Sequence, residues 1–126
     1  MPFVRIMTGT SYNETQKRDI STLLQRALNE TFAVPAQDRF HFFESFGPGD
    51  RYIDPDYLSA GRTEKALLFN IVAGKPRSEA QKAAFYRRLA SELSQQMGIA
   101  EADVMVVIQF TAAEDWSFSG GILYQP

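Results

Sequence analysis

A proline that directly follows the initiator methionine offers the most distinctive chemistry in this sequence. Pro2 opens a mostly apolar segment, residues 2–8, that is predicted to be a strand. Methionine before a small residue such as proline is normally removed in the cytosol, so we expect a mature chain that begins with Pro2. Its secondary amine would titrate near pH ~8 and could act as a base, an acid or a nucleophile. A Met-Pro start is also common in proteins where it has no role.

Two basic residues, Lys75 and Arg77, flank Pro76 just before a predicted helix. Cations are unfavourable at a helix N-terminus by a few tenths to about 1 kcal/mol, so this placement makes sense if an anion binds there. The free backbone N–H groups and the two cations would together form a carboxylate or phosphate site. The alternative is a solvated basic loop.

A carboxylate that precedes a predicted strand, Asp38, is the candidate partner of the Pro2 amine. A negative charge beside the amine would favour its ammonium form and raise the pKa of Pro2. Asp103 holds the equivalent position in the second half of the chain. Capping of a turn, as expected of Asp103, is therefore the alternative role for Asp38.

Aromatic residues near the end of the chain provide a possible apolar wall. Trp116 and Phe118 alternate in the tail and could line a small pocket, although aromatic residues near a chain end more often serve packing. His41 is the only histidine and shares a strand face with Arg39. We expect it to be structural, with a role in the site as the less favoured reading.

Composition narrows the chemistry to amines, guanidinium groups, carboxylates and hydroxyls. The 126 residues suit one domain, and a 44% hydrophobic content with 22% charge is ordinary for a globular protein. A net charge of −2 gives no reason to expect a nucleic-acid partner. The absence of cysteine and the single histidine argue against a metal site, so no cofactor is expected. Without a signal sequence or an apolar run of about 20 residues, we expect a cytoplasmic protein with no membrane partner.

The hydrophobic pattern predicts a β-α-β unit that occurs twice, at about 2–46 and 65–110, within a single domain 1–126. The predicted strands are 2–8, 39–46, 65–73 and 103–110. Capping-box patterns place the helix starts at Ser11 with Glu14 and at Ser78 with Gln81, and the helices should end near Ala33 and Gly98.

Two β-α-β units predict an α+β fold, a four-stranded sheet with both helices on one face. The starts of the first and third strands should lie side by side or be related by a pseudo-twofold axis, which would bring Pro2 and the basic turn to one cleft. Strands 39–46 and 103–110 are apolar on both faces. The face without helices must then be buried, and association with other subunits is favoured over cover by the C-terminal tail.

Two segments lie outside the repeat. The long polar loop 47–64 is of a kind that is more often functional than filler. The tail, 111–126, contains a Gly-Gly turn followed by a short apolar segment, which predicts a C-terminal hairpin that could pair with a neighbouring chain.

Several segments at matching spacing resemble the tautomerase superfamily, most closely the malonate semialdehyde decarboxylase family. Val34–Arg39 is similar to that family's V-P-P-T-D-R segment, and Pro76–Lys82 is similar to P-R-S-E-E-Q-K. Asp115–Phe118 matches D-W-S-F, and Gly61–Arg62 in the long loop also has a counterpart. The resemblance covers nearly the whole chain and implies a homotrimeric, cofactor-independent enzyme that acts on a small carboxylate.

The resemblance also implies roles for the residues singled out above. Pro2 matches the catalytic proline and Asp38 the carboxylate that works with it. Arg77 matches one of two substrate-binding arginines, whereas Lys75 stands where the family has the other. Lysine keeps the charge but loses the bidentate fork of arginine. Trp116 and Phe118 match an apolar wall.

Three functions remain open at this point. The first is decarboxylation of a small 3-oxo acid or hydration of an unsaturated acid, with Pro2 protonated. The second is keto–enol tautomerisation of a 2-oxo acid such as phenylenolpyruvate, with Pro2 neutral and acting as a base. The third is a non-catalytic oligomeric binding module that retains the fold.

Overall fold

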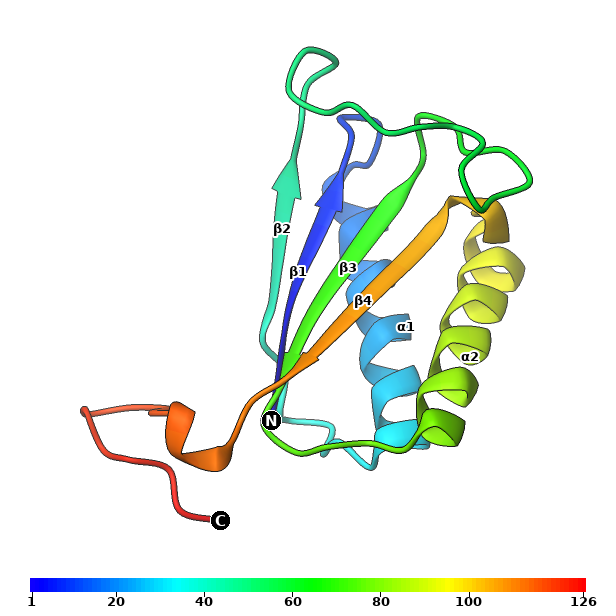
Figure 1. Ribbon diagram of the computed structural model, residues 1–126. Coiled ribbons are helices and arrows are strands. Elements are labelled where there is room, and N and C mark those ends of the chain that lie inside the picture. Colours follow the sequence, from blue (N-terminus) through cyan, green and yellow to red (C-terminus); the bar gives the residue numbers. More distant parts are fainter.

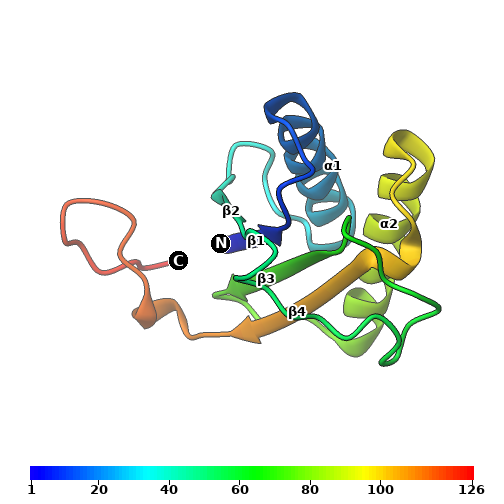
Figure 2. The ribbon, with the colours of Figure 1, turned by 90° about the horizontal axis from the view of Figure 1, so that it is seen from above.

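The computed structural model describes residues 1–126 and shows one four-stranded sheet with two helices on a single face (Figures 1 and 2). The strands are β1 (Pro2–Thr8), β2 (His41–Ser45), β3 (Leu67–Ala73) and β4 (Val104–Phe110). The helices are α1 (Glu14–Phe32) and α2 (Glu79–Met97). The predicted fold class is confirmed.

The order of the strands, β2-β1-β3-β4, places the two repeats side by side. Each repeat pairs its own two strands in parallel, and the repeats meet through the antiparallel pair of β1 and β3. The starts of β1 and β3 are therefore at opposite ends of the sheet, and Pro2 pairs with Ala73 at the end of β3. The basic turn begins at Lys75, two residues after Ala73. Pro2 and this turn therefore lie at the same edge because the pairing is antiparallel.

The predicted start of α1 is wrong by two residues. Asn13 is the N-cap: its side chain accepts from the Gln16 backbone N–H at 2.8 Å, and the Gln16 side chain accepts from the Asn13 N–H at 2.9 Å. The Ser11 and Glu14 pair has the same spacing, but asparagine is an equally strong N-cap and lies next to the helical residues. The box predicted at Ser78 in α2 is confirmed, with distances of 2.9 and 3.1 Å.

Alternate residues of the strands separate a core from an open face. The helix-facing residues form a buried cluster with the apolar stripes of α1 and α2. The residues between them face away from the helices, and several are exposed, including Phe42 at 55% and Val107 at 46%. The C-terminal tail projects beyond the sheet and does not cover this face (Figures 1 and 2).

The tail turns back on itself but contains no strand. After a short 3-10 turn at Ala113–Asp115, the chain reverses through Gly120 and Gly121, which both have positive φ. The returning segment makes two backbone bonds, from the Ile122 N–H to the Ser119 carbonyl at 3.2 Å and from the Tyr124 N–H to the Trp116 carbonyl at 2.9 Å. The hairpin is thus present as a turn, without the short apolar strand that was predicted.

The long loop 47–64 lies at the opposite end of the sheet from Pro2 (Figure 1). Arg51 and Arg62 hold it by donating to backbone carbonyls of Ala66 and Asp54 at 2.8 and 2.9 Å. The loop is therefore away from the residues that the sequence places in the site. No helix in the structure is both long and apolar enough to span a membrane.

Candidate active site

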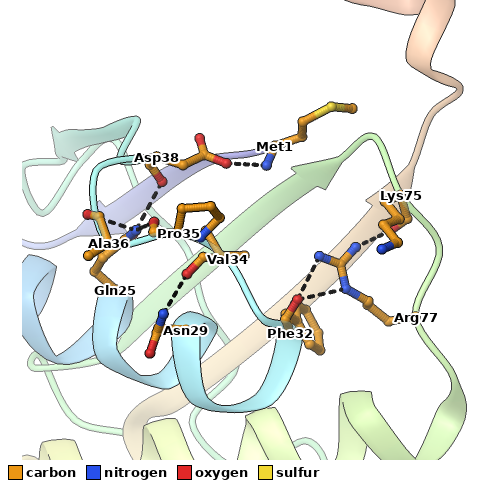
Figure 3. Close-up of polar contacts among 10 residues, drawn as sticks. All are labelled: Met1, Gln25, Asn29, Phe32, Val34, Pro35, Ala36, Asp38, Lys75 and Arg77. Atoms are coloured by element: carbon orange, nitrogen blue, oxygen red, sulfur yellow. Dashed lines mark hydrogen bonds and ion pairs between the residues drawn. The ribbon is translucent and has the colours of Figure 1, made fainter. Parts of the chain in front are cut away.

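The amino terminus and Asp38 face one another at one edge of the sheet (Figure 3). The Met1 ammonium forms an ion pair with Asp38 Oδ2, and the two side chains are only 15% and 19% exposed. Pro2 is buried at the start of β1. The Cα atoms of consecutive residues are about 3.8 Å apart. The Pro2 nitrogen therefore lies one residue away from the Met1 nitrogen, which is paired with Asp38.

Helix α1 positions Asp38 through a buried glutamine. The Gln25 Nε2 donates to the backbone carbonyls of Pro35 at 2.9 Å and Asp38 at 3.0 Å (Figure 3). Asn29 Nδ2 donates to the Val34 carbonyl at 2.8 Å, which fixes the start of the same segment. Sequence reasoning missed Gln25; the available signal was a polar residue inside the apolar stripe of α1.

Asp38 and Asp103 have different surroundings despite their equivalent places in the repeats. Asp103 is 2% exposed and accepts from the Thr63 N–H at 2.6 Å and the Thr63 Oγ1 at 2.7 Å. It anchors the chain at the opposite end of the sheet. The Asp38 carboxylate has the amino terminus as its only hydrogen-bond partner. The turn-capping role, which was expected of Asp103 and was the alternative for Asp38, is therefore seen for Asp103 alone.

The basic turn presents its two cations differently. Lys75 is exposed and makes no ion pair, whereas Arg77 binds the end of α1. The Arg77 Nη2 and Nε donate to the Phe32 carbonyl at 2.9 and 3.3 Å, Nη1 donates to the Lys75 carbonyl, and the guanidinium stacks over the Phe32 ring at 5.0 Å. A cation at the C-terminus of a helix is favourable. Burial lowers the pKa of Arg77 from its ordinary value, although an arginine stays protonated at neutral pH.

These contacts leave part of the guanidinium available. Arginine has five N–H donors, and the structure uses one on Nε, one on Nη1 and one on Nη2. One N–H remains on each terminal nitrogen, which suits a carboxylate. No hydrogen bond joins Arg77 to Asp38 or to the aromatic residues of the tail.

The aromatic residues predicted as a wall do pack together, with two more that the sequence did not single out. Trp116 stacks on Phe118 with ring centroids 5.4 Å apart. Phe118 also contacts Phe40 at 5.9 Å and Tyr124 at 5.2 Å. Phe40 lies two residues after Asp38, so this cluster joins the tail to the segment that carries the candidate acid. The Trp116 Nε1 donates to Thr111 Oγ1 at 2.6 Å and fixes the indole.

His41 lies on the helix side of β2, away from these groups. Its Nδ1 is 2.7 Å from the Ser21 hydroxyl of α1. Burial, assisted by the positive charge of Arg39, lowers the pKa of His41 to about 4, so the ring is neutral at physiological pH. The geometry fits the structural role expected of it. No cluster of acidic, histidine or cysteine side chains in the chain is arranged to hold a metal ion.

Known proteins are similar to this chain in sequence and in fold. Residues 38–119 match the family model described as tautomerase enzyme. The chain belongs to the tautomerase family. The probable tautomerase YusQ of Bacillus subtilis (strain 168) is 29% identical over 121 residues, which cover 96% of this chain and 95% of that one.

Solved structures with the tautomerase fold are also similar to this chain. Malonate semialdehyde decarboxylase, described with decarboxylase and hydratase activities, superposes with a TM-score of 0.90 and 28% identity over 96% of this chain and 93% of the other. A second one (FG41), inhibited by 3-bromopropiolate, has a TM-score of 0.88 and 26% identity over 96% and 92%. A fused 4-OT, described as a symmetric trimer, shares the fold at 19% identity and a TM-score of 0.71, over 96% and 94%. The predicted resemblance is confirmed.

Proposed function

We propose that this tautomerase family member is a decarboxylase of a small 3-oxo acid that uses the amine of Pro2. The observation that carries the proposal is the placement of the Asp38 carboxylate on the amino terminus, with both groups largely buried. Once Met1 is removed, the nearby carboxylate favours the ammonium form of Pro2. The similarity to malonate semialdehyde decarboxylase at 28% identity supports the same reaction class.

The proposed mechanism uses Pro2 as an electron sink. Its ammonium group donates a hydrogen bond to the 3-oxo oxygen, or the amine condenses with that carbonyl to an iminium with loss of water. The bond between C2 and the carboxylate then breaks, CO2 leaves, and the electron pair forms an enolate or an enamine. Protonation at C2, and hydrolysis where an iminium formed, releases the product and restores the amine.

The remaining site residues would orient the acid. The free N–H groups of Arg77 and the Lys75 ammonium would bind the carboxylate and hold it out of the plane of the carbonyl. Trp116 and Phe118 would provide apolar surroundings that disfavour the charged ground state. The same groups would allow hydration of an unsaturated acid, with Asp38 activating a water molecule.

Replacement of Pro2 by Ala tests the role of the amine. We expect intact-mass analysis of the purified protein to show a chain that begins at Pro2, and Pro2→Ala to retain only a trace of turnover because a primary amine substitutes poorly. Steady-state assays with a 3-oxo acid measure the loss, and thermal melting controls for the fold. Retained Met1, or full activity in Pro2→Ala, would exclude the proposal. A Pro2→Ala variant that loses no activity in any of the reactions tested would favour a non-catalytic binding module.

A keto–enol tautomerase of 2-oxo acids is the second candidate. The burial of Pro2 and the nearby cations of the basic turn favour a neutral amine, which is the base that tautomerisation needs. The relative YusQ also has the name of a probable tautomerase. The two reactions need opposite protonation states of Pro2, so they can be separated by their pH dependence.

We further propose a homotrimer, assembled through the open face of the sheet. The apolar side chains of Val107 and Phe42 are exposed there, at 46% and 55%. Light scattering should give three times the 14.2 kDa chain mass, and Val107→Glu should shift the protein to smaller species. Ala84→Glu, on the exposed surface of α2, is the control. A stable wild-type monomer at micromolar concentration would contradict this assembly.

A further inference from the structure

The two repeats of the chain keep a constant offset of 65 positions. Strands β1 and β3 start at residues 2 and 67, and helices α1 and α2 start at residues 14 and 79. Single hydrogen bonds keep the same offset. The Phe46 N–H donates to the Thr8 carbonyl at 2.9 Å, and its counterpart runs from the Thr111 N–H to the Ala73 carbonyl, also at 2.9 Å. Because β1 and β3 are antiparallel, residues at the Pro2 end of the sheet have counterparts at the end that carries loop 47–64 (Figure 1).

The counterpart of the tail tryptophan is an arginine. Trp116 lies beside Gly74, and Arg51 lies beside Gly9 in the same way. A Cβ atom built at Gly74 would be 2.8 Å from Trp116 Nε1, and one built at Gly9 would be 3.0 Å from Arg51 Nη2. Thr10 has the place that the first cation of the basic turn has at the other end. The second end therefore carries its cation on the loop and a small hydroxyl on the turn.

Arg51 and Gly9 line a polar pocket of about 200 Å³ at this second end. Thr10 and Ser11 of the turn and the start of loop 47–64 form most of the remaining wall. Glu64 is the only acidic residue that lines the pocket, and its side chain is exposed to solvent. The volume is many times what one water molecule needs, so an anion of the size of acetate or phosphate fits.

The pocket is rich in hydrogen-bond donors without an acceptor in the protein. Arg51 donates from Nη1 to the Ala66 carbonyl at 2.8 Å and from Nη2 to the Glu64 carbonyl at 3.1 Å. Arginine has five N–H donors, so three remain, and Arg51 forms no ion pair with any carboxylate. The N–H groups of Gly9 and Thr10 donate to no backbone carbonyl, although Gly9 is buried. Buried N–H groups without a partner are rare in proteins, and a bound anion would provide one here.

We propose that this pocket is a second binding site, specific for a small oxyanion such as a carboxylate or phosphate. The Arg51 guanidinium is held in place by its two carbonyl bonds and presents its free N–H groups to the anion. The hydroxyls of Thr10 and Ser11 and the N–H of Gly9 complete the set of donors.

The second site binds its ligand without converting it. The counterpart of Pro2 is Leu67, which lies inside the chain and has no free amine. The counterpart of Asp38 is Asp103, whose carboxylate already accepts two hydrogen bonds from Thr63. Anion binding at Arg51 therefore does not depend on the reaction proposed for Pro2.

Amide 1H–15N spectra of the full chain, titrated with inorganic phosphate and separately with acetate, test this site. We expect the signals of Gly9, Thr10 and Gly47 to shift, and Arg51→Gln to weaken the binding about 10-fold or more. The amides of the basic turn report the other end of the sheet separately. Arg62→Gln is the matched control, because Arg62 also holds the loop through two carbonyls, at 2.9 and 2.7 Å, but does not line the pocket. No shift with either anion, or equal binding by wild type and Arg51→Gln, would overturn the proposal.

Substitution of Thr10 tests the same site while Arg51 and its loop contacts stay in place. Thr10 is exposed, so its replacement does not disturb the core. Thr10→Lys adds the cation found at the other end and should tighten anion binding about 2- to 5-fold, whereas Thr10→Glu should weaken it by a similar factor. Unchanged affinity in both variants would overturn the proposal even if Arg51→Gln fails to fold. Tighter binding of acetate than of phosphate assigns the site to carboxylates, and the reverse order assigns it to phosphate.

Discussion

Replacement of Asp38 by Asn should reduce decarboxylation of a 3-oxo acid by about 100-fold or more, and should spare or raise enol tautomerisation. The substitution keeps the shape of the side chain but removes the negative charge that faces the amino terminus. Loss of that charge lowers the pKa of the Pro2 amine. Less ammonium is then present at neutral pH, which weakens catalysis by the protonated form and increases the supply of the neutral base.

The measurement is a pair of pH–rate profiles, on a 3-oxo acid and on the enol of a 2-oxo acid, for wild type and Asp38→Asn. The range in which decarboxylation is active should move to lower pH in the variant, because the ammonium form survives only there. A 1H–15N titration of the Pro2 amine should show the same displacement. Parallel small losses in both reactions would remove Asp38 from the mechanism and favour the tautomerase.

Asp103→Asn is the matched control, since the repeat gives Asp103 the equivalent place before β4. Its carboxylate accepts two hydrogen bonds from Thr63 and is buried, far from the amino terminus. Loss of a buried acceptor of this kind costs about 1–3 kcal/mol of stability. Asp103→Asn should therefore lower the melting temperature and leave the ratio of the two activities unchanged.

The fold could be predicted because its signals are local in the sequence. The apolar segment at the start of the chain predicted the full range of β1, Pro2–Thr8, and the capping pattern at Ser78 predicted the start of α2. The end of α1 near Ala33, predicted from the proline two residues later, is confirmed. The left-handed conformation of Ala33 was not predicted. Where two capping patterns overlapped, at Ser11 and Asn13, spacing alone could not choose between them.

The site could be predicted only where a residue has an unusual chemical identity. Pro2 and Asp38 were accessible in this way, and parallel pairing within the first repeat places both at one edge of the sheet. The basic turn reaches the same edge only through antiparallel pairing between the repeats, which no local pattern specifies. The Gln25 amide joins α1 to the segment that carries Asp38. Gly74 lies close to both Met1 and Trp116, which are near the two ends of the chain. Contacts of this kind follow from tertiary packing rather than from spacing.

Arg77 illustrates the same limit. Its position before α2 suggested an anion site, and nothing in the sequence linked it to Phe32, 45 residues earlier. In the structure the C-terminal carbonyl of α1 holds the guanidinium by two of its nitrogens. This arrangement fixes the side chain before any ligand arrives, so less conformational entropy is lost on binding.

Replacement of Arg77 by Ala should therefore lower kcat/KM for carboxylate substrates by one to two orders of magnitude or more. A charge-assisted hydrogen bond contributes about 1.5–3 kcal/mol, and the two free N–H groups of Arg77 are the donors available to a carboxylate. Lys75→Ala should cost less, because its ammonium is exposed and binds as a point charge. Lys75→Arg should improve decarboxylation if a second fork grips the acid.

The contact with Phe32 means that Arg77→Ala also removes a stabilising interaction at the end of α1, so activity and stability must be measured together. Arg87→Ala is the control, since Arg87 is an exposed arginine of α2 without an ion pair. A purely structural role for Arg77 predicts a lower melting temperature with kcat/KM unchanged in the folded fraction. A binding role predicts that kcat/KM falls for the folded protein, and unchanged kcat/KM would show that the carboxylate binds elsewhere.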